Sequence, residues 1–262
     1  MGIRMKSFLL LFLIIFSITV IWPQNSKKNT LPKLQDLMSV LEIASLNRTL
    51  WDLAINYPDE KYKTKSNKDV ISDLKKRLEI QSLQNDSLGK LVEYQLFKKY
   101  NTNVLNMFAE LGLIGEELGM FIYVDNSMPV NFALKDNHLT FLLMGVASEN
   151  SFNTLRLTAK ERAVKIIESM ILPTINKIYK SFNETEIKYI GMAVTYGSKD
   201  FSDESSVLNQ KPETVILVVS MEKCKDYIAG KITQEELVNA SDIFQSSRDM
   251  IEGVKKIKVT IE

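Results

Sequence analysis

The sequence predicts an α+β protein in which an N-terminal helical layer precedes a mixed or antiparallel sheet packed with helices. Apolar residues recur at helical spacing through residues 31–119, and the alternation typical of strands begins after Gly119. No regular alternation of strands and helices follows, which argues against a parallel doubly wound sheet. We expect three regions: a signal peptide or membrane anchor at 1–24, a helical region at 25–119 and an α+β sheet region at 120–262. The last two are expected to form one globular unit.

The N-terminus has the pattern of an export signal. Arg4 and Lys6 precede the apolar run 7–22, which is shorter than the roughly 20 residues that span a bilayer comfortably. Bulky Ile21 and Trp22 stand where a cleavage site prefers small residues. Two alternatives stay open. A cleaved signal peptide predicts a periplasmic or extracellular protein, and an uncleaved anchor predicts a protein held at the membrane by residues 7–22.

Composition excludes several classes of function. The chain has 33 basic and 32 acidic residues, so it lacks the basic excess of a nucleic-acid-binding protein, and we expect no nucleic-acid partner. Cys224 is the one cysteine and His138 the one histidine. One chain therefore builds no internal disulfide and no zinc site of four cysteines, or of two cysteines and two histidines. A Ser-His-Asp centre would have to use His138. We predict no cofactor and assign no catalytic residue.

The region up to Gly119 is predicted to be a helical layer or small bundle, ending at that glycine. Its apolar positions follow helical spacing but do not sustain a heptad, which disfavours a long coiled coil. The polar segment 61–68 separates two parts of this region. The positions on which the prediction depends include Leu34, Leu37, Met38, Val104, Met107, Phe108, Leu111, Ile114 and Leu118. We expect the aromatic residues Tyr94, Phe97 and Tyr100 to pack internally.

A short strand at 121–124 and a hairpin at 130–146 are predicted next. The hairpin has Asp136–Asn137 at its tip, a pair that suits a two-residue turn. Such a turn pairs Lys135 with His138, Leu134 with Leu139 and Phe132 with Phe141. The leucines and phenylalanines then share one face, as a buried face requires. His138 falls on the other face beside the turn, so we interpret it as an exposed turn residue and not as a catalytic or ligand histidine.

Two capping boxes mark later helices. Thr158 and Glu161 open a helix at 159–182, which Pro173 is expected to kink, and Thr233 and Glu236 open a second helix.

Three strands complete the sheet region. The segment 189–197 alternates large apolar residues with the small residues Gly191, Ala193 and Thr195, and we expect this small face to pack under the helix 159–182. Residues 214–220 are apolar on both faces and are predicted to form the central strand. Residues 256–261 alternate and carry lysines, which is typical of an edge strand.

The candidate functional site follows the strand at 189–197. Its residues Ser198, Lys199, Asp200, Asp203 and Glu204 are the candidate ligand- or metal-binding residues. A serine–lysine hydrolase is disfavoured because adjacent strand residues point to opposite faces. The carboxylates offer oxygen ligands to Ca²⁺ or Mg²⁺, but the spacing of an EF-hand is missing, and we assign no metal. We interpret the stretch as a strand reaching its turn, followed by a solvated loop long enough to suggest a role.

Cys224 lies between Lys223 and Lys225, which offers a route to a depressed thiol pKa. No base or resolving cysteine accompanies it in the sequence. We therefore favour a half-buried structural cysteine on a helix over a reactive one.

These observations favour an exported, non-catalytic envelope or secreted protein that acts as a binding or accessory module. Its expected partner is an unknown protein or small-molecule ligand in the cell envelope. The alternative is a membrane-tethered interaction or assembly factor, whose helical region contacts the partner. A less favoured alternative is a carboxylate-based hydrolase that uses Asp200, Asp203, Glu204 and Asp125.

Overall fold

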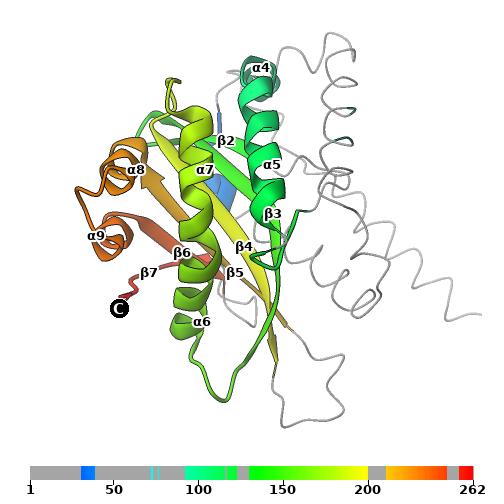
Figure 1. Cartoon of the computed structure of the whole chain (residues 1–262), viewed down its shortest axis with the longest axis vertical. Helices are drawn as coiled ribbons and strands as arrows, with labels where there is room; N and C mark the ends of the chain where they lie inside the picture. Colours follow the sequence, from blue (N-terminus) through cyan, green and yellow to red (C-terminus); the bar gives the residue numbers. More distant parts are fainter. Residues whose placement is uncertain are drawn as a thin grey trace, which may run out of the picture. The chain divides into compact units, whose positions relative to one another are not determined.

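The computed structural model describes residues 31–38, 72, 76, 92–115, 117–122, 130–199, 211–246 and 254–261 (Figure 1). All of them belong to one compact unit. The expected signal peptide or anchor at 1–24 lies outside the described residues. Within the described ranges, no helix is both long enough and apolar enough to cross a membrane.

Seven strands of the described chain form one mixed sheet, which agrees with the predicted α+β class. The sheet order is β1-β3-β4-β5-β6-β7, and β2 also pairs with β3. The β3–β4 pair is parallel and all other pairs are antiparallel. The strands are β1 (Met120–Ile122), β2 (Val130–Lys135), β3 (His138–Asn153), β4 (Tyr189–Lys199), β5 (Lys211–Ser220), β6 (Asp242–Ser246) and β7 (Val254–Ile257).

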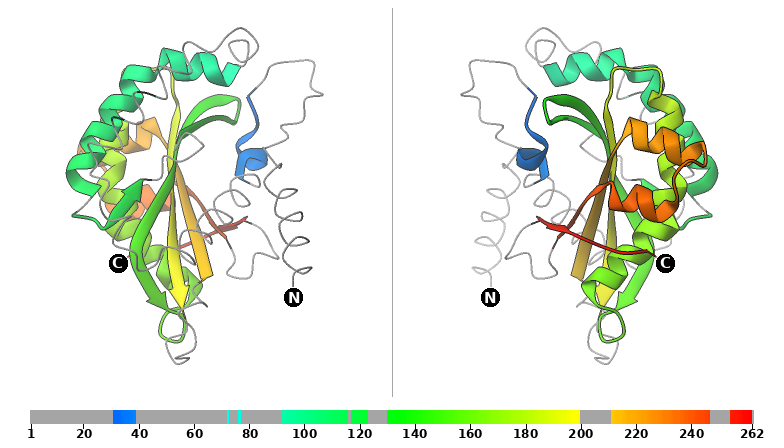
Figure 2. Two further views of the ribbon diagram at one scale, coloured as in Figure 1. Left: turned by 90° about the vertical axis from the view of Figure 1, so that its right-hand side faces the viewer. Right: turned by 90° about the vertical axis from the view of Figure 1, so that its left-hand side faces the viewer.

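The named helices cover one face of this sheet, and a short helical segment, residues 34–38, lies on the other face (Figures 1 and 2). A single crossover of α6, a π-helical turn and α7 joins the parallel strands β3 and β4. The helical elements are α4 (Val92–Lys99), α5 (Asn101–Gly115), α6 (Ala159–Ile166), the π-helical turn (Ile167–Ile171), α7 (Leu172–Phe182), α8 (Met221–Ile228) and α9 (Gln234–Asn239).

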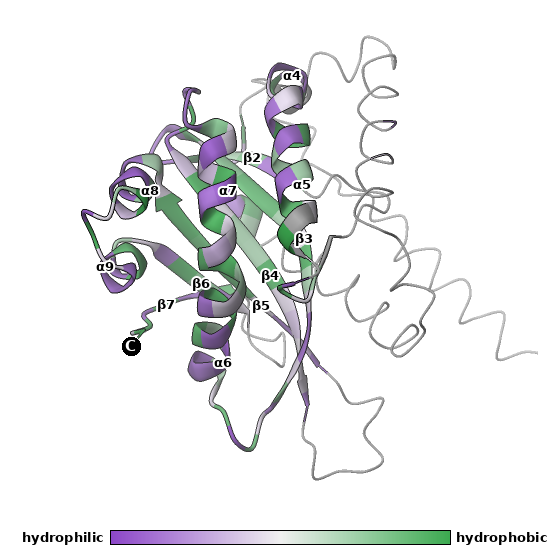
Figure 3. Cartoon of the chain, viewed as in Figure 1, coloured by the Kyte–Doolittle hydropathy of each residue, from purple (hydrophilic) through white to green (hydrophobic). Residues whose placement is uncertain are grey.

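The main core lies between the helices and the sheet, where apolar residues concentrate on the strands and on the inner sides of the helices (Figure 3). Aromatic rings join the layers: the Phe141 ring centroid lies 4.2 Å from that of Phe182, and Phe132 contacts both Phe97 and Tyr100. The prediction that Phe97 and Tyr100 pack internally is therefore confirmed.

The predicted hairpin register is confirmed residue for residue. Lys135 pairs with His138, Leu134 with Leu139, and Phe132 with Phe141. Asp136 and Asn137 both adopt positive φ, 50° and 63°, the conformation that a two-residue turn of the primed type requires. His138 is exposed beside the turn, as expected.

The predicted packing of the small face of β4 is wrong. The helices α6 and α7 pack on the face that carries Ile190, Met192, Val194 and Tyr196. Gly191 lies on the opposite face, where a Cβ atom would approach Leu142 Cδ2 to 2.6 Å. Large side chains of the neighbouring strands, and not a helix, therefore occupy the space that the small residue leaves.

The helix predicted at 159–182 is confirmed, since α6, the π-helical turn and α7 follow one another without a break. The π-helical turn lies directly before Pro173, and Leu172 N–H there donates to Ile167 O. The wider turn accommodates a proline, which lacks an N–H and crowds the preceding turn. Helix α5 ends at Gly115, four residues before the predicted stop, and Gly119 adopts positive φ in the turn before β1. The edge strand is confirmed at the end of the sheet, but it covers Val254–Ile257.

Candidate functional site

The structure places two of the five predicted site residues. Ser198 and Lys199 end strand β4, and Ser198 pairs with Lys211 at the start of β5. The two strands therefore hold both ends of the intervening loop side by side. Asp200, Asp203 and Glu204 lie outside the described residues.

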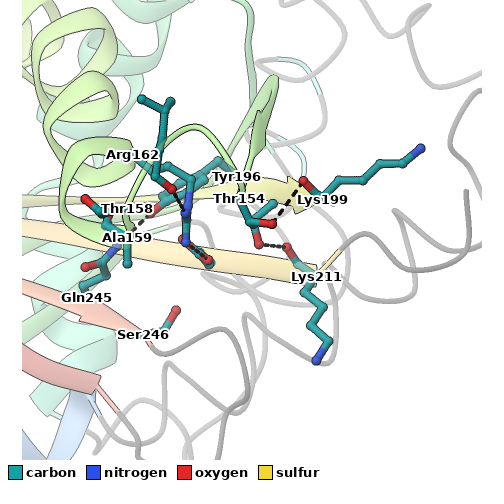
Figure 4. Close-up of polar contacts among 12 residues, drawn as sticks. Thr154, Thr158, Ala159, Arg162, Tyr196, Lys199, Lys211, Gln245 and Ser246 are labelled. Atoms are coloured by element: carbon teal, nitrogen blue, oxygen red, sulfur yellow. Dashed lines mark hydrogen bonds and ion pairs between the residues drawn. The ribbon is translucent and has the colours of Figure 1, made fainter. Parts of the chain in front are cut away.

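Ser198 and Lys199 do not form a reactive pair. The Ser198 side chain is fully buried, and its hydroxyl donates to Lys211 O at 3.1 Å. Lys199 is half-buried, and its side chain points away from Thr154 (Figure 4). Its carbonyl oxygen accepts from Thr154 N–H at 3.0 Å and from the Thr154 hydroxyl at 3.4 Å. Ser198 thus holds the end of β4 to the start of β5, and Lys199 holds it to the turn that follows β3.

A buried ion pair, which sequence reasoning missed, lies in the same part of the fold. Arg162 on α6 donates from Nε to Glu213 Oε2 at 3.0 Å and from Nη2 to Glu213 Oε1 at 2.6 Å. The two side chains are only 5% and 1% exposed. Arg162 Nη1 also donates to Leu157 O, in the turn before α6. This bidentate geometry is the strong form of a charged hydrogen bond, and it fixes α6 and its preceding turn to β5.

Neutral polar groups complete the cluster. Gln245 Nε2 on β6 donates to the Tyr196 hydroxyl at 3.0 Å and to Ala159 O at 2.7 Å (Figure 4). Burial raises the pKa of Tyr196 well above its usual value, and the Glu213 carboxylate adds to the shift. The phenol therefore stays protonated at physiological pH. The cluster connects α6 with three adjacent strands and presents no exposed nucleophile or base.

One sequence signal could have found the ion pair. On β5, Val215, Leu217 and Val219 share the face of the main core, and the same period of two places Glu213 on that face. A lone carboxylate at a core position needs a partner, because burying an unpaired charge is costly. The identity of that partner, Arg162, follows only from the packing of α6 on the sheet.

A second network lies at the opposite end of the sheet and is partly exposed. Lys135 Nζ is 2.7 Å from Asp242 Oδ2 and 4.7 Å from the centroid of the Tyr189 ring, and Lys256 pairs with the other oxygen of Asp242. Burial acts to raise the pKa of Asp242, but the hydrogen bonds from both lysines outweigh it and lower the pKa. The network joins β2, β4, β6 and β7.

Cys224 is fully buried on α8, and burial raises the pKa of its thiol to about 12. The expectation of a half-buried side chain underestimates this burial. The favoured interpretation of a structural cysteine on a helix is confirmed, and Lys223 and Lys225 do not depress the thiol pKa, because desolvation disfavours the thiolate. At neutral pH this thiol is therefore a packing group and not a nucleophile.

No described group of three or more His, Cys, Asp or Glu residues has the arrangement of a metal site. No protein-family model matches the chain, and no curated protein or solved structure matches it significantly. The functional argument therefore depends on the geometry of the chain itself.

Proposed function

We propose that the protein is an exported, non-catalytic binding or accessory module that presents the Leu155 end of the sheet to a partner. The Leu155 end comprises the turn 154–158 and the β4–β5 loop that leaves at Lys199 and returns at Lys211. The observation that carries the proposal is that the buried polar side chains at this end hold the structure together and form no reactive centre. Arg162, Glu213 and Ser198 all hold neighbouring backbone or strands in place from buried positions.

The side chains that are exposed at this end suit contact with another molecule. Leu155 is 66% exposed, more than any other large apolar side chain in the described part of the chain, and Arg156 beside it is also exposed. Arg162 donates to Leu157 O and Thr154 N–H donates to Lys199 O, so the turn is anchored at both ends, and an anchored turn lowers the entropic cost of binding. The partner is an unknown protein or small-molecule ligand of the cell envelope, and Asp200, Asp203 and Glu204 remain candidate contacts on the loop.

Site-specific photocrosslinking in the native host tests this proposal. A photoreactive residue replaces Leu155 in one variant and Lys165, an exposed position on α6, in the control variant. We expect one discrete adduct with an envelope component from position 155, none from position 165, and loss of the adduct in the Asp200→Ala/Glu204→Ala background. Absence of any adduct from position 155 argues against a binding role for this end.

An activity screen tests the hydrolase alternative. Turnover of an ester, peptide, glycoside or phosphate substrate, abolished by a single acidic substitution such as Asp200→Ala, would replace the binding module with an enzyme. We expect no such turnover.

The second candidate function is a membrane-tethered interaction or assembly factor. Only residues 23–30 separate the apolar run 7–22 from Leu31, where the described unit begins, and bulky Ile21 and Trp22 disfavour cleavage. Fractionation of the native host followed by intact mass separates the two candidates. A full-length chain in the membrane fraction supports the tether, whereas a soluble chain lacking about 23 to 26 residues indicates a cleaved signal peptide.

A further inference from the structure

The turn 154–158, which joins β3 to α6, uses every one of its backbone N–H groups internally. The acceptors come from three elements: the end of β3, the end of β4 and the first turn of α6. The hydrogen bonds are Thr154 N–H to Lys199 O at 3.0 Å, Leu155 N–H to Asn153 Oδ1 at 2.9 Å, Arg156 N–H and Leu157 N–H to Asn153 O at 3.3 and 3.1 Å, and Thr158 N–H to Glu161 Oε2 at 2.6 Å. The turn therefore keeps no backbone N–H with which to bind a ligand.

Asn153 organises most of this turn. Its side-chain oxygen and its backbone oxygen together accept the N–H groups of residues 155–157. A side-chain carbonyl that accepts from the residue two positions further on forms an Asx turn, which defines the local backbone. Arg162 adds a hydrogen bond to Leu157 O. Leu155 therefore lies on a backbone that is held on both sides, although its own side chain is 66% exposed.

This combination narrows the kind of partner. An anion held by backbone groups and a peptide added as an extra strand both need N–H donors, and the turn has none to give. Contact with the turn must then come from side chains, of which Leu155 and Arg156 are the exposed neighbours. Covering a leucine with apolar surface strengthens binding by roughly tenfold or more, so Leu155 is the group that gains most from a partner.

We propose that the partner is a protein with an apolar pocket that receives the Leu155 side chain, and that Asn153 is the positioning residue that presents this side chain. The inference rests on the proposed function and narrows it, because it selects a protein over a small-molecule ligand. A turn that is already ordered loses little conformational freedom on binding, so the burial of Leu155 contributes almost fully to the affinity. Arg156 lies at the rim of the pocket, where its charge stays in water.

Photocrosslinking from position 156 in the native host tests the pocket. A photoreactive residue replaces Arg156 in every chain, so that Leu155 itself can be varied. Leu155→Ser removes the apolar group, and Leu155→Met is the matched control that keeps one. We expect a single adduct with the added mass of a protein, about tenfold less of it in Leu155→Ser and about twofold less at most in Leu155→Met. Both variants should unfold at the denaturant concentration of the parent chain, because Leu155 is largely exposed.

A second matched pair tests Asn153. Asn153→Asp keeps an acceptor for Leu155 N–H, whereas Asn153→Ala removes it. In Asn153→Ala we expect faster hydrogen exchange of the Leu155 amide and a several-fold weaker adduct, and Asn153→Asp should restore both. Gly191→Ala disturbs the packing between strands away from this turn, and it should leave the adduct unchanged. This control separates positioning from a general loss of stability.

The outcomes report the failure of each step separately. An adduct that is as strong in Leu155→Ser as in the parent chain, or whose added mass is that of a small molecule, overturns the pocket while the binding role of this end stands. An adduct that is equally strong in Asn153→Ala, or weakened to the same degree in Gly191→Ala, overturns the positioning role. No adduct from position 155 or 156 in any background overturns the proposed function and this inference together.

Discussion

Removing one partner of the buried Arg162–Glu213 pair should destabilise the protein strongly. Glu213→Gln leaves the Arg162 cation buried opposite a neutral amide, and Arg162→Met leaves the carboxylate buried without its two donors. Breaking a buried pair on one side costs about 3–5 kcal/mol. Arg162→Met also removes the donor to Leu157 O, which adds about 1–3 kcal/mol if that carbonyl stays unpaired. We therefore expect Arg162→Met to be the more damaging change.

The double variant Arg162→Met/Glu213→Leu separates charge pairing from packing. Both charges are removed and the side-chain volume is largely kept, so the main remaining loss is the hydrogen bond to Leu157 O, about 1–3 kcal/mol. The double variant should thus be more stable than Arg162→Met alone. Denaturant unfolding at pH 7 of the wild type, the single variants Arg162→Met and Glu213→Leu, and the double variant closes the double-mutant cycle and measures the coupling. Single variants that each cost less than about 1 kcal/mol, with additive effects, would refute a buried pair.

Three further predictions concern other parts of the fold. Gly191→Ala should lower the free energy of unfolding by about 1–3 kcal/mol, because the new Cβ meets the Leu142 side chain and lies 2.9 Å from the backbone oxygen of Leu217. An unchanged free energy of unfolding would contradict this packing. Cys224 should not react with a thiol reagent at pH 8 until denaturant unfolds the chain, because its pKa is about 12; rapid reaction of the native protein counts against its burial. Asp242→Asn should lower the melting temperature at pH 7. The pKa of Asp242 is lower in the folded than in the unfolded protein, so its carboxylate stabilises the fold at any pH above the unfolded value of about 3.9 and loses this effect as it is protonated at lower pH. The difference in melting temperature between Asp242→Asn and wild type should therefore shrink as the pH falls below about 3.9. A difference that stays constant to about pH 3 would exclude the charge effect.

Local features of the sequence were sufficient to predict the structure wherever it depends on residues that are close together in the chain. The Asp136–Asn137 turn and the period of two predicted the hairpin register correctly, because a two-residue turn leaves one pairing that buries the apolar face. The capping boxes at Thr158 and Thr233 are both present, because their hydrogen bonds join residues only three apart. The buried apolar run of β5 identified an interior strand.

The candidate site was only partly predictable. Ser198 and Lys199 lie at the expected strand end, but their hydrogen bonds to Lys211 and Thr154 hold loops together and are not part of a reactive centre. The side of β4 on which the helices pack was also predicted wrongly. Either face of an alternating strand can accept a helix, so the alternation alone leaves the side open, and in the structure the side chain of Leu142 lies against Gly191.

The amino-acid sequence was sufficient to predict the α+β class, the two capped helix starts, the hairpin register and the exposed position of the one histidine. These features depend on residues a few positions apart, whose geometry the backbone constrains. The parallel β3–β4 pair, the full burial of Cys224 and the Arg162–Glu213 pair, whose members are 51 residues apart, became visible only in the packed fold. Such contacts form when packed elements exclude water, so charge and burial at a position depend on which distant element lies against it.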